Sequence, residues 1–331
     1  MRTRIKHWQL ETNPESALKN SQTPGIGRLA AIENYLLINN LGKNLESAMV
    51  ADGHLQQVAR FEQTLYPNQD DEQQFDIDMH SLLRWRQWLL AINHYGLIRF
   101  LDWEDFTCNP DNLSAPDSEA KATCRHSMQW PGDVERFEVF DDCLISSSPQ
   151  GYSVPDQAQN GLLISAPLHE LSRTEFISDR QAPVLPYNKH LEDWGSISAL
   201  AIDHGQSLLA VAAQSRLAVF RLTTGPGRAP DIGQTVLEEH LPFVITFLQC
   251  NQSSGLLAAG HDLSVRSEEP EPANDWDSLK GGGYWHCDLK GTTLRGSFKP
   301  DLAFGNGADP IVCSDDGDTI FAVDRMAGLH S

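Results

Sequence analysis

The sequence predicts an all-β fold built from a repeated unit. Each unit has an apolar strand of about five residues, a short polar bend and a second strand with alternating apolar positions. The clearest copy, ISALAIDHGQSLLAVAAQSRLAVFRL, spans 197–222 and divides into strands over 197–202, 208–213 and 216–222. With 40% apolar and 21% charged residues, the chain has enough apolar side chain to bury a sizeable core.

The apolar character of the strands changes across this unit. LLAVAA is apolar on both faces, which is typical of a strand enclosed by other elements, whereas RLAVFRL alternates as a half-buried strand does. Such a gradient is expected across one blade of a β-propeller, where neighbouring blades enclose the inner strands and the outer strands contact water. The sequence therefore predicts a β-propeller of four-stranded blades.

Weaker copies of the unit occur on both sides of the clearest one. They span 28–61, 81–103, 137–154, 243–265 and 309–331. Their spacing fits blades of about 40 to 50 residues and predicts about six blades. A seventh is expected if a poorly marked copy lies within 155–195.

A helix is the alternative for residues 82–92, LLRWRQWLLAI, because Leu82, Trp85, Leu89 and Ile92 would share one helical face. The residues that follow, NHYGLIRFLDW, change to a turn and a strand. Two strands are therefore favoured over one helix in this segment.

Three acidic stretches, 66–78, 109–122 and 266–283, interrupt the repeats. They have too few aliphatic residues to offset the entropy of ordering, so we expect solvated loop insertions within a single domain of 1–331. An acidic docking site is the alternative use of such charge. The last insertion would lie inside the fifth copy, whose outer hairpin is expected at 283–298, GYWHCDLKGTTLRGSF.

The last copy, 309–331, ends after its third strand and would leave an unpaired sheet edge. The segment IKHWQLE at 5–11 alternates in character and is a candidate for the missing strand. We expect it to pair beside 319–331 and close the ring. If the two segments lie far apart, the end of the sequence would instead resemble that of a truncated product.

These repeats resemble β-propellers of the WD-repeat or quinoprotein-like type over most of the chain. WD-repeat blades usually carry a Gly-His pair before the innermost strand and a Trp-Asp pair at the end of the third. Here Gly260-His261 follows an apolar second strand, and third strands end in FRL (220–222) or LDW (101–103). The Trp-docking motifs and cofactor-binding residues of quinoproteins are not matched. The resemblance implies the architecture and no particular family.

The net charge of −20 would repel phosphate backbones, and no basic patch is present, so no nucleic acid is expected as a partner. No stretch approaches the ~18 apolar residues of a membrane span. The start, MRTRIK, is followed by HWQLETNPES and lacks the apolar core of a signal peptide. Six scattered cysteines without a CxxC pair are typical of reduced thiols, so a cytoplasmic location is expected.

No GxSxG, HExxH or Walker A motif is present. Histidine and aspartate do occur in the bends, although bends favour these residues in any case. The sequence thus favours a non-enzymatic protein-interaction scaffold without a cofactor. The alternative is a metal-assisted propeller hydrolase or lyase, with a ligand set drawn from the bends: Asp203, His204, His261 and Asp262.

The expected binding surface of the scaffold is the rim formed by the loops and bends of the blades. Its candidate residues for contact with one or more partner proteins are His94, Tyr95, Arg216, His261, Arg325 and Met326. If the blades align as predicted, these side chains project from one rim.

Overall fold

The computed structural model is built almost entirely of antiparallel β-sheets. It describes residues 7–8, 26–40, 44–51, 54–62, 79–93, 96–107, 124–130, 136–147, 161–168, 186–225, 228–241, 243–250, 255–262, 282–289, 311–313, 320–323 and 329–330. Short 3₁₀ helices, η1 (Trp103–Phe106) and η4 (Glu192–Trp194), interrupt the strands. The prediction of an all-β fold is confirmed.

The first three sheets each have four strands in sequence order. Sheet 1 consists of β2 (Ile26–Ile32), β3 (Tyr35–Asn40), β4 (Asn44–Ala51) and β5 (His54–Glu62). Sheet 2 consists of β6 (Met79–Trp85), β7 (Trp88–Asn93), β8 (Leu97–Asp102) and β9 (Cys124–Gln129). Sheet 3 consists of β10 (Arg136–Phe140), β11 (Cys143–Ser147), β12 (Leu162–Ser165) and β13 (Tyr187–His190).

The other three sheets follow the same plan with two differences. Sheet 4 consists of β14 (Ala199–Asp203), β15 (Leu208–Ala213), β16 (Arg216–Thr223) and β17 (Asp231–His240). Sheet 5 has three described strands, β18 (Phe243–Cys250), β19 (Gly255–Asp262) and β20 (Gly282–Asp288). Sheet 6 combines β21 (Ile311–Cys313), β22 (Ile320–Val323) and β23 (Leu329–His330) with the N-terminal β1 (His7–Trp8).

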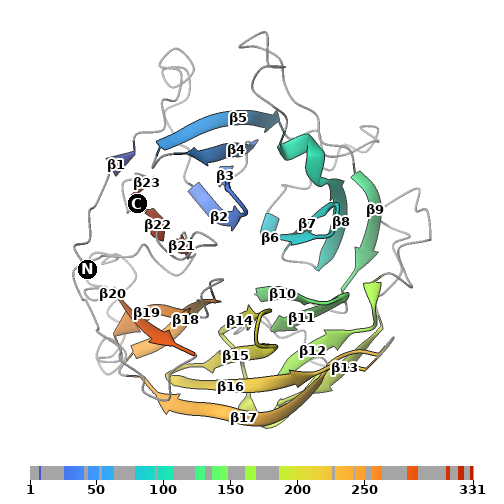
Figure 1. Ribbon diagram of the computed structural model, residues 1–331, viewed down its shortest axis with the longest axis vertical. Helices are drawn as coiled ribbons and strands as arrows, with labels where there is room; N and C mark the ends of the chain where they lie inside the picture. Colours follow the sequence, from blue (N-terminus) through green and yellow to red (C-terminus); the bar gives the residue numbers. More distant parts are fainter. Residues whose placement is uncertain are drawn as a thin grey trace, which may run out of the picture.

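The six sheets lie around a common centre, with the first strand of each nearest to it and the later strands outside (Figure 1). The first strands of neighbouring sheets contact each other: β2 with β6, β6 with β10, β10 with β14, β14 with β18, β18 with β21, and β21 with β2. This arrangement is compatible with a propeller.

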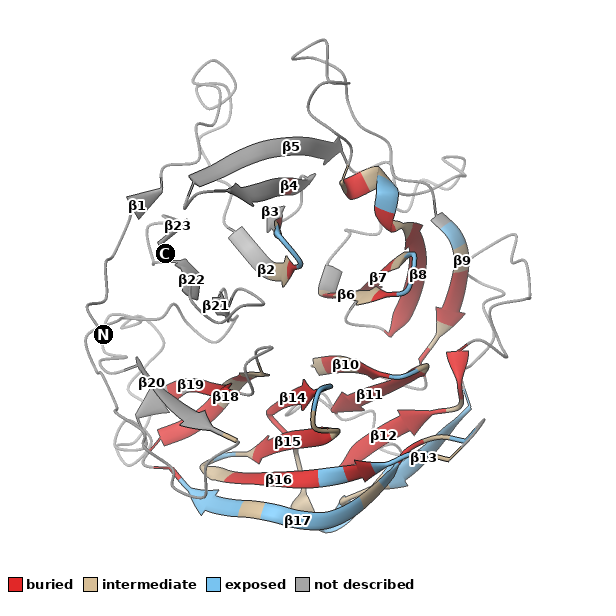
Figure 2. Cartoon of the chain, in the orientation of Figure 1, coloured by how far each residue is buried: buried red, intermediate tan, exposed pale blue. Residues whose placement is uncertain are grey.

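The burial of the strands falls from the centre outward. In sheet 4, all five residues of β14 are buried, whereas nearly all of β17 is exposed, and Figure 2 shows the same trend across sheets 3 and 4. Within the described ranges, clusters of buried residues occupy the spaces between sheets 2 and 3, sheets 3 and 4, and sheets 4 and 5. Each fully buried Leu or Phe there contributes roughly 1.5–3 kcal/mol. The core therefore lies between the sheets.

The strand predictions for the clearest copy and for 82–92 are confirmed, and the helical alternative is wrong. β6 and β7 are joined by a two-residue turn at Arg86 and Gln87, and Trp85 pairs with Trp88 across it. The apolar residues that would share a helical face thus lie on two strands of one hairpin.

One expected repeat boundary is wrong, whereas the first strand of the hairpin expected in the fifth copy is present. The described strands within 155–195, β12 and β13, pair in order onto β11 and complete sheet 3. The shorter copy at 137–154 therefore supplies only the first two strands of that sheet. In sheet 5, β20 pairs directly with β19 and is the third strand. The remainder of the hairpin expected at 283–298 lies outside the described residues.

The pairing expected for the N-terminal segment is present. β1 runs antiparallel to β23, with His7 opposite His330 and Trp8 opposite Leu329. Of the three acidic insertions, 66–78 and 109–122 lie outside the described residues, and 266–283 does so except for Gly282 and Gly283, which begin β20.

Gly260, of the Gly-His pair noted in the sequence, lies where two backbones approach closely. It pairs with Ile245 beside a register shift in β18, and a Cβ atom at this position would lie 1.8 Å from the Val244 carbonyl oxygen. The glycine is thus required by packing within sheet 5. Among the described residues, no helix is long and apolar enough to cross a membrane.

Candidate functional site

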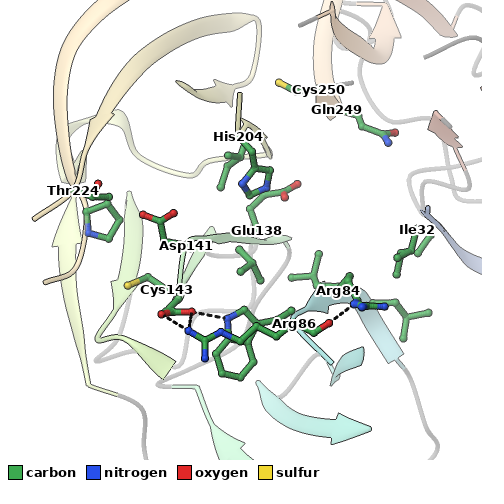
Figure 3. Close-up of a pocket in the computed structure, with 18 of the residues that line it drawn as sticks. Ile32, Arg84, Arg86, Glu138, Asp141, Cys143, His204, Thr224, Gln249 and Cys250 are labelled. Carbon is green, nitrogen blue, oxygen red and sulfur yellow. Dashed lines mark hydrogen bonds and ion pairs between the residues drawn. The ribbon is translucent and has the colours of Figure 1, made fainter. Parts of the chain in front are cut away.

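A cavity of about 1020 Å³ opens where the first strands converge. Sheets 1 to 4 line it with the turns that join their first and second strands, and sheet 5 adds the end of β18, at Gln249 and Cys250. Figure 3 shows these side chains around the opening. The cavity therefore draws its lining from segments that are far apart in the sequence.

Three of these turns share an unusual backbone conformation. Glu33, Arg86 and Asp141 each occupy the first position of the turn after a first strand, with φ of 56°, 53° and 51°. Non-glycine residues are uncommon in this region, and each costs on the order of 1 kcal/mol. The repeated geometry places an exposed charged side chain at the equivalent position in three successive sheets.

Ion pairs connect these turns between sheets. The Arg84 guanidinium lies 3.7 Å from the Glu33 carboxylate, joining sheets 1 and 2. Arg86 donates to Asp142 at 2.7 Å, joining sheets 2 and 3, and the Trp85 indole Nε1 donates to the same carboxylate at 3.2 Å. We refer to Glu33, Arg84, Arg86, Asp141, Asp142 and His204 as the charged belt.

His204 extends the charged belt to sheet 4. Its ring stacks on Phe140 of sheet 3, with centroids 6.0 Å apart. Burial lowers the pKa of His204, against the opposing effects of Asp141 and Asp203, so the imidazole is neutral at neutral pH. The buried Asp203 accepts hydrogen bonds from the backbone N–H and the side-chain amide of Gln206, both at 3.0 Å. Asp203 thus holds the turn that presents His204.

Glu138 lies on β10 and lines the cavity. The side chain is half-buried, and burial raises the pKa of its carboxyl group to about 8, although nearby Arg136 acts to lower it. Arg136 itself donates to the Thr246 carbonyl at 3.0 Å, which ties β10 to β18. At neutral pH the cavity therefore contains a protonated carboxyl group.

The sequence prediction did not include Glu138. In the strand RFEVF the glutamate is the middle residue, between the buried Phe137 and Val139. A charged residue inside a first strand was the available signal. Its significance depends on the position of β10 beside the cavity, which the local pattern does not specify.

Of the residues predicted for the partner-binding rim, Arg216 is placed in most detail. It begins β16, its guanidinium lies 3.8 Å from the centroid of the Trp194 ring, and it pairs with Glu238 at 2.8 Å. His261 is the penultimate residue of β19. The other predicted rim residues, His94, Tyr95, Arg325 and Met326, lie outside the described residues.

The four candidate metal ligands lie at opposite ends of their sheets. Asp203 ends β14 and His204 follows it, at the cavity end. Asp262 pairs with Phe243, the first residue of β18, and the start of β18 bonds to the β15–β16 turn through the Ile245 N–H and the Gln214 carbonyl. His261 and Asp262 are thus at the other end. Within the described ranges, no group of three or more His, Cys, Asp or Glu residues could hold a metal ion.

Comparison of the chain with protein-family models and with curated proteins finds no match to either.

Proposed function

We propose that this chain is a six-bladed β-propeller, closed by β1 on β23, that acts as a non-enzymatic protein-interaction module and binds its partner on the face carrying the charged belt. The closed ring is supported by the contacts between successive first strands, including β21 with β2, and by the pairing of His7 with His330. The interaction role is supported by the surface at the cavity.

The observation that carries the proposal is the charged belt. Turns from four sheets present charged or polar groups around one opening, and the Glu33–Arg84 and Arg86–Asp142 pairs connect neighbouring sheets there. A surface that is already ordered loses less conformational entropy on binding. The surface carries both positive and negative groups, and proteins select their partners by matching such charges across an interface.

The opposite face is the alternative binding surface, since Arg216 begins β16 and His261 lies near the end of β19, beside the bends between second and third strands. Arg216 at that face is already engaged by Trp194 and Glu238. To contact a partner through its guanidinium it would have to give up these bonds. On the cavity face, Asp141 is exposed and has no ion pair in the described structure, so it could contact a partner without such a loss.

Site-specific photo-crosslinking in the source cells tests this proposal. A photoreactive amino acid replaces one exposed glutamine at a time: Gln87 in the β6–β7 turn on the cavity face, Gln214 in the β15–β16 turn on the opposite face, or Gln234 on the outer strand β17. The three positions are matched in residue type and exposure. The proposal predicts a discrete protein adduct from Gln87 and much weaker adducts from Gln214 and Gln234.

An adduct formed mainly from Gln214 would show that the partner binds at the opposite face, and it would overturn the proposal that the cavity face is the binding surface. Equal adducts from all three positions, or none from Gln87, would overturn the proposed interaction on this surface.

A further inference from the structure

Among the described residues, four acidic side chains and three arginines line the cavity: Glu33, Glu138, Asp141 and Asp142, with Arg84, Arg86 and Arg228. Arg84 and Arg86 are each committed to a carboxylate of the charged belt, Glu33 and Asp142 respectively. In the described structure, Glu138 and Asp141 line the cavity without an ion pair. The carboxylates therefore outnumber the lining arginines by one once Glu138 loses its proton, which leaves this carboxyl group for a bound cation.

In the described part of the chain, neither of the other arginines near the cavity forms an ion pair with Glu138. Arg228 lines the opening but is exposed to solvent, in a turn closed by its N–H and the Gly225 carbonyl. Arg136 faces Glu138 from the same strand but donates to the Thr246 carbonyl. His204 carries no charge at neutral pH because burial lowers its pKa. The thiols of Cys143 and Cys250 add no positive charge.

We propose that the cavity receives an arginine side chain of the partner protein, whose guanidinium pairs with Glu138 while Asp141 attracts it at the opening. This inference rests on the proposed function, since it names the group that the partner inserts. The net charge of −20 favours a cationic group over long range. A guanidinium fits better than an ammonium, because it is less strongly hydrated and can bond a carboxylate with two parallel N–H groups.

Insertion of the guanidinium is coupled to a proton. Before binding, Glu138 is mostly protonated at neutral pH, because burial raises its pKa to about 8. The ion pair needs the carboxylate, so the carboxyl group gives its proton to solvent as the guanidinium binds. Close to one proton is therefore released per arginine at about pH 7, and binding tightens as the pH rises toward 9.

The test uses the purified full chain and the peptide acetyl-Gly-Arg-Gly-amide, with citrulline in place of arginine as a neutral peptide of the same shape. Isothermal titration calorimetry in two buffers of different ionisation enthalpy measures affinity and proton release. For the unsubstituted chain we expect the arginine peptide to bind about tenfold tighter than the citrulline peptide. We also expect its affinity to rise about tenfold between pH 7 and pH 9.

Glu138→Gln is expected to abolish both effects. The matched control is Glu239→Gln, which makes the same change of net charge on the exposed outer strand β17 and is expected to leave both effects intact. If Glu138→Gln fails to fold, the pH dependence of binding and the proton release measured with the unsubstituted chain still test the inference. Equal binding of the two peptides, or arginine binding without proton release at pH 7, would overturn the inference.

Failure of this inference is distinguishable from failure of the proposed function. A strong Gln87 adduct together with equal binding of the two peptides would support the proposed interaction face and reject arginine as the inserted group. Arginine-specific binding that depends on Glu138, without a Gln87 adduct, would support the guanidinium site in the cavity and reject a protein partner on this face.

Discussion

Glu138 is an acidic residue in a partly buried position, so the stability of the folded protein depends on its protonation and hence on pH. In the unfolded chain its carboxyl group loses its proton near pH 4.5, whereas in the folded protein burial raises the pKa to about 8. The folded state therefore binds the extra proton between these values. The stability that Glu138 contributes is fully present below about pH 4.5 and is lost as the pH rises through about 8.

Glu138→Gln removes this titration while keeping the shape of the protonated acid. We predict equal free energies of unfolding for the two proteins near pH 4.5. By about pH 8 the variant should be more stable by on the order of 1–2 kcal/mol, a value reduced for the partial exposure of the side chain. Urea denaturation at several pH values measures the difference. Its absence at every pH would mean that the carboxyl group is well solvated.

Arg216 acts at the scale of elements, because its side chain joins η4, β16 and β17. It stacks on Trp194, and its guanidinium bonds Glu238. We predict that Arg216→Ala lowers the free energy of unfolding by about 1–2 kcal/mol. Arg216→Lys should restore only part of the loss, because an ammonium lacks the planar stacking surface. Denaturant titration of the three proteins measures both effects.

The same substitutions separate a structural role for Arg216 from the predicted rim role. If Arg216 mainly holds the outer strands of sheet 4, Arg216→Ala leaves the Gln87 photo-adduct unchanged in the folded protein. Loss of that adduct without loss of stability would instead assign Arg216 to the binding surface.

The elements that the sequence predicts well are those with a strong local pattern. In LLAVAA and RLAVFRL, apolar residues and bends mark the strands, and β15 and β16 lie where expected. The outer strand β17, DIGQTVLEEH, was not predicted, because it exposes most of its side chains on both faces and carries no apolar alternation. Its strand conformation depends on pairing with β16, which the segment itself does not encode.

The candidate site was harder to predict than the strands. Asp203 and His204 were predicted as bend residues; His204 lies in the β14–β15 turn, whereas Asp203 is the last residue of β14. The cavity was not foreseen, since its lining comes from turns of separate sheets. Bringing Glu138, Arg86 and His204 to one opening depends on how the sheets pack, whereas sequence patterns report only the order within each sheet.

At the scale of the whole molecule, the cavity and its charged belt depend on six sheets surrounding one centre. The contacts between successive first strands are compatible with that arrangement. The proposed closure depends on the short pairing of β1 with β23, which joins segments from the two ends of the sequence. The proposed binding face keeps its geometry only if this ring holds together.

An engineered disulfide between β1 and β23 tests the ring most directly. His7→Cys combined with His330→Cys places two cysteines at directly opposed positions, where Cα atoms lie within disulfide range. The control, Trp8→Cys with His330→Cys, is shifted by one residue, which directs the two new side chains to opposite faces. Peptide mapping after mild oxidation and urea denaturation of the product are the measurements.

The closed ring predicts that the folded protein forms the 7–330 disulfide readily and forms the 8–330 disulfide poorly. The 7–330 bond should also raise the free energy of unfolding by on the order of 2–4 kcal/mol, because it constrains a very long loop in the unfolded chain. Failure of the 7–330 bond to form in the folded protein, or formation of both bonds to the same extent, would contradict the closed ring.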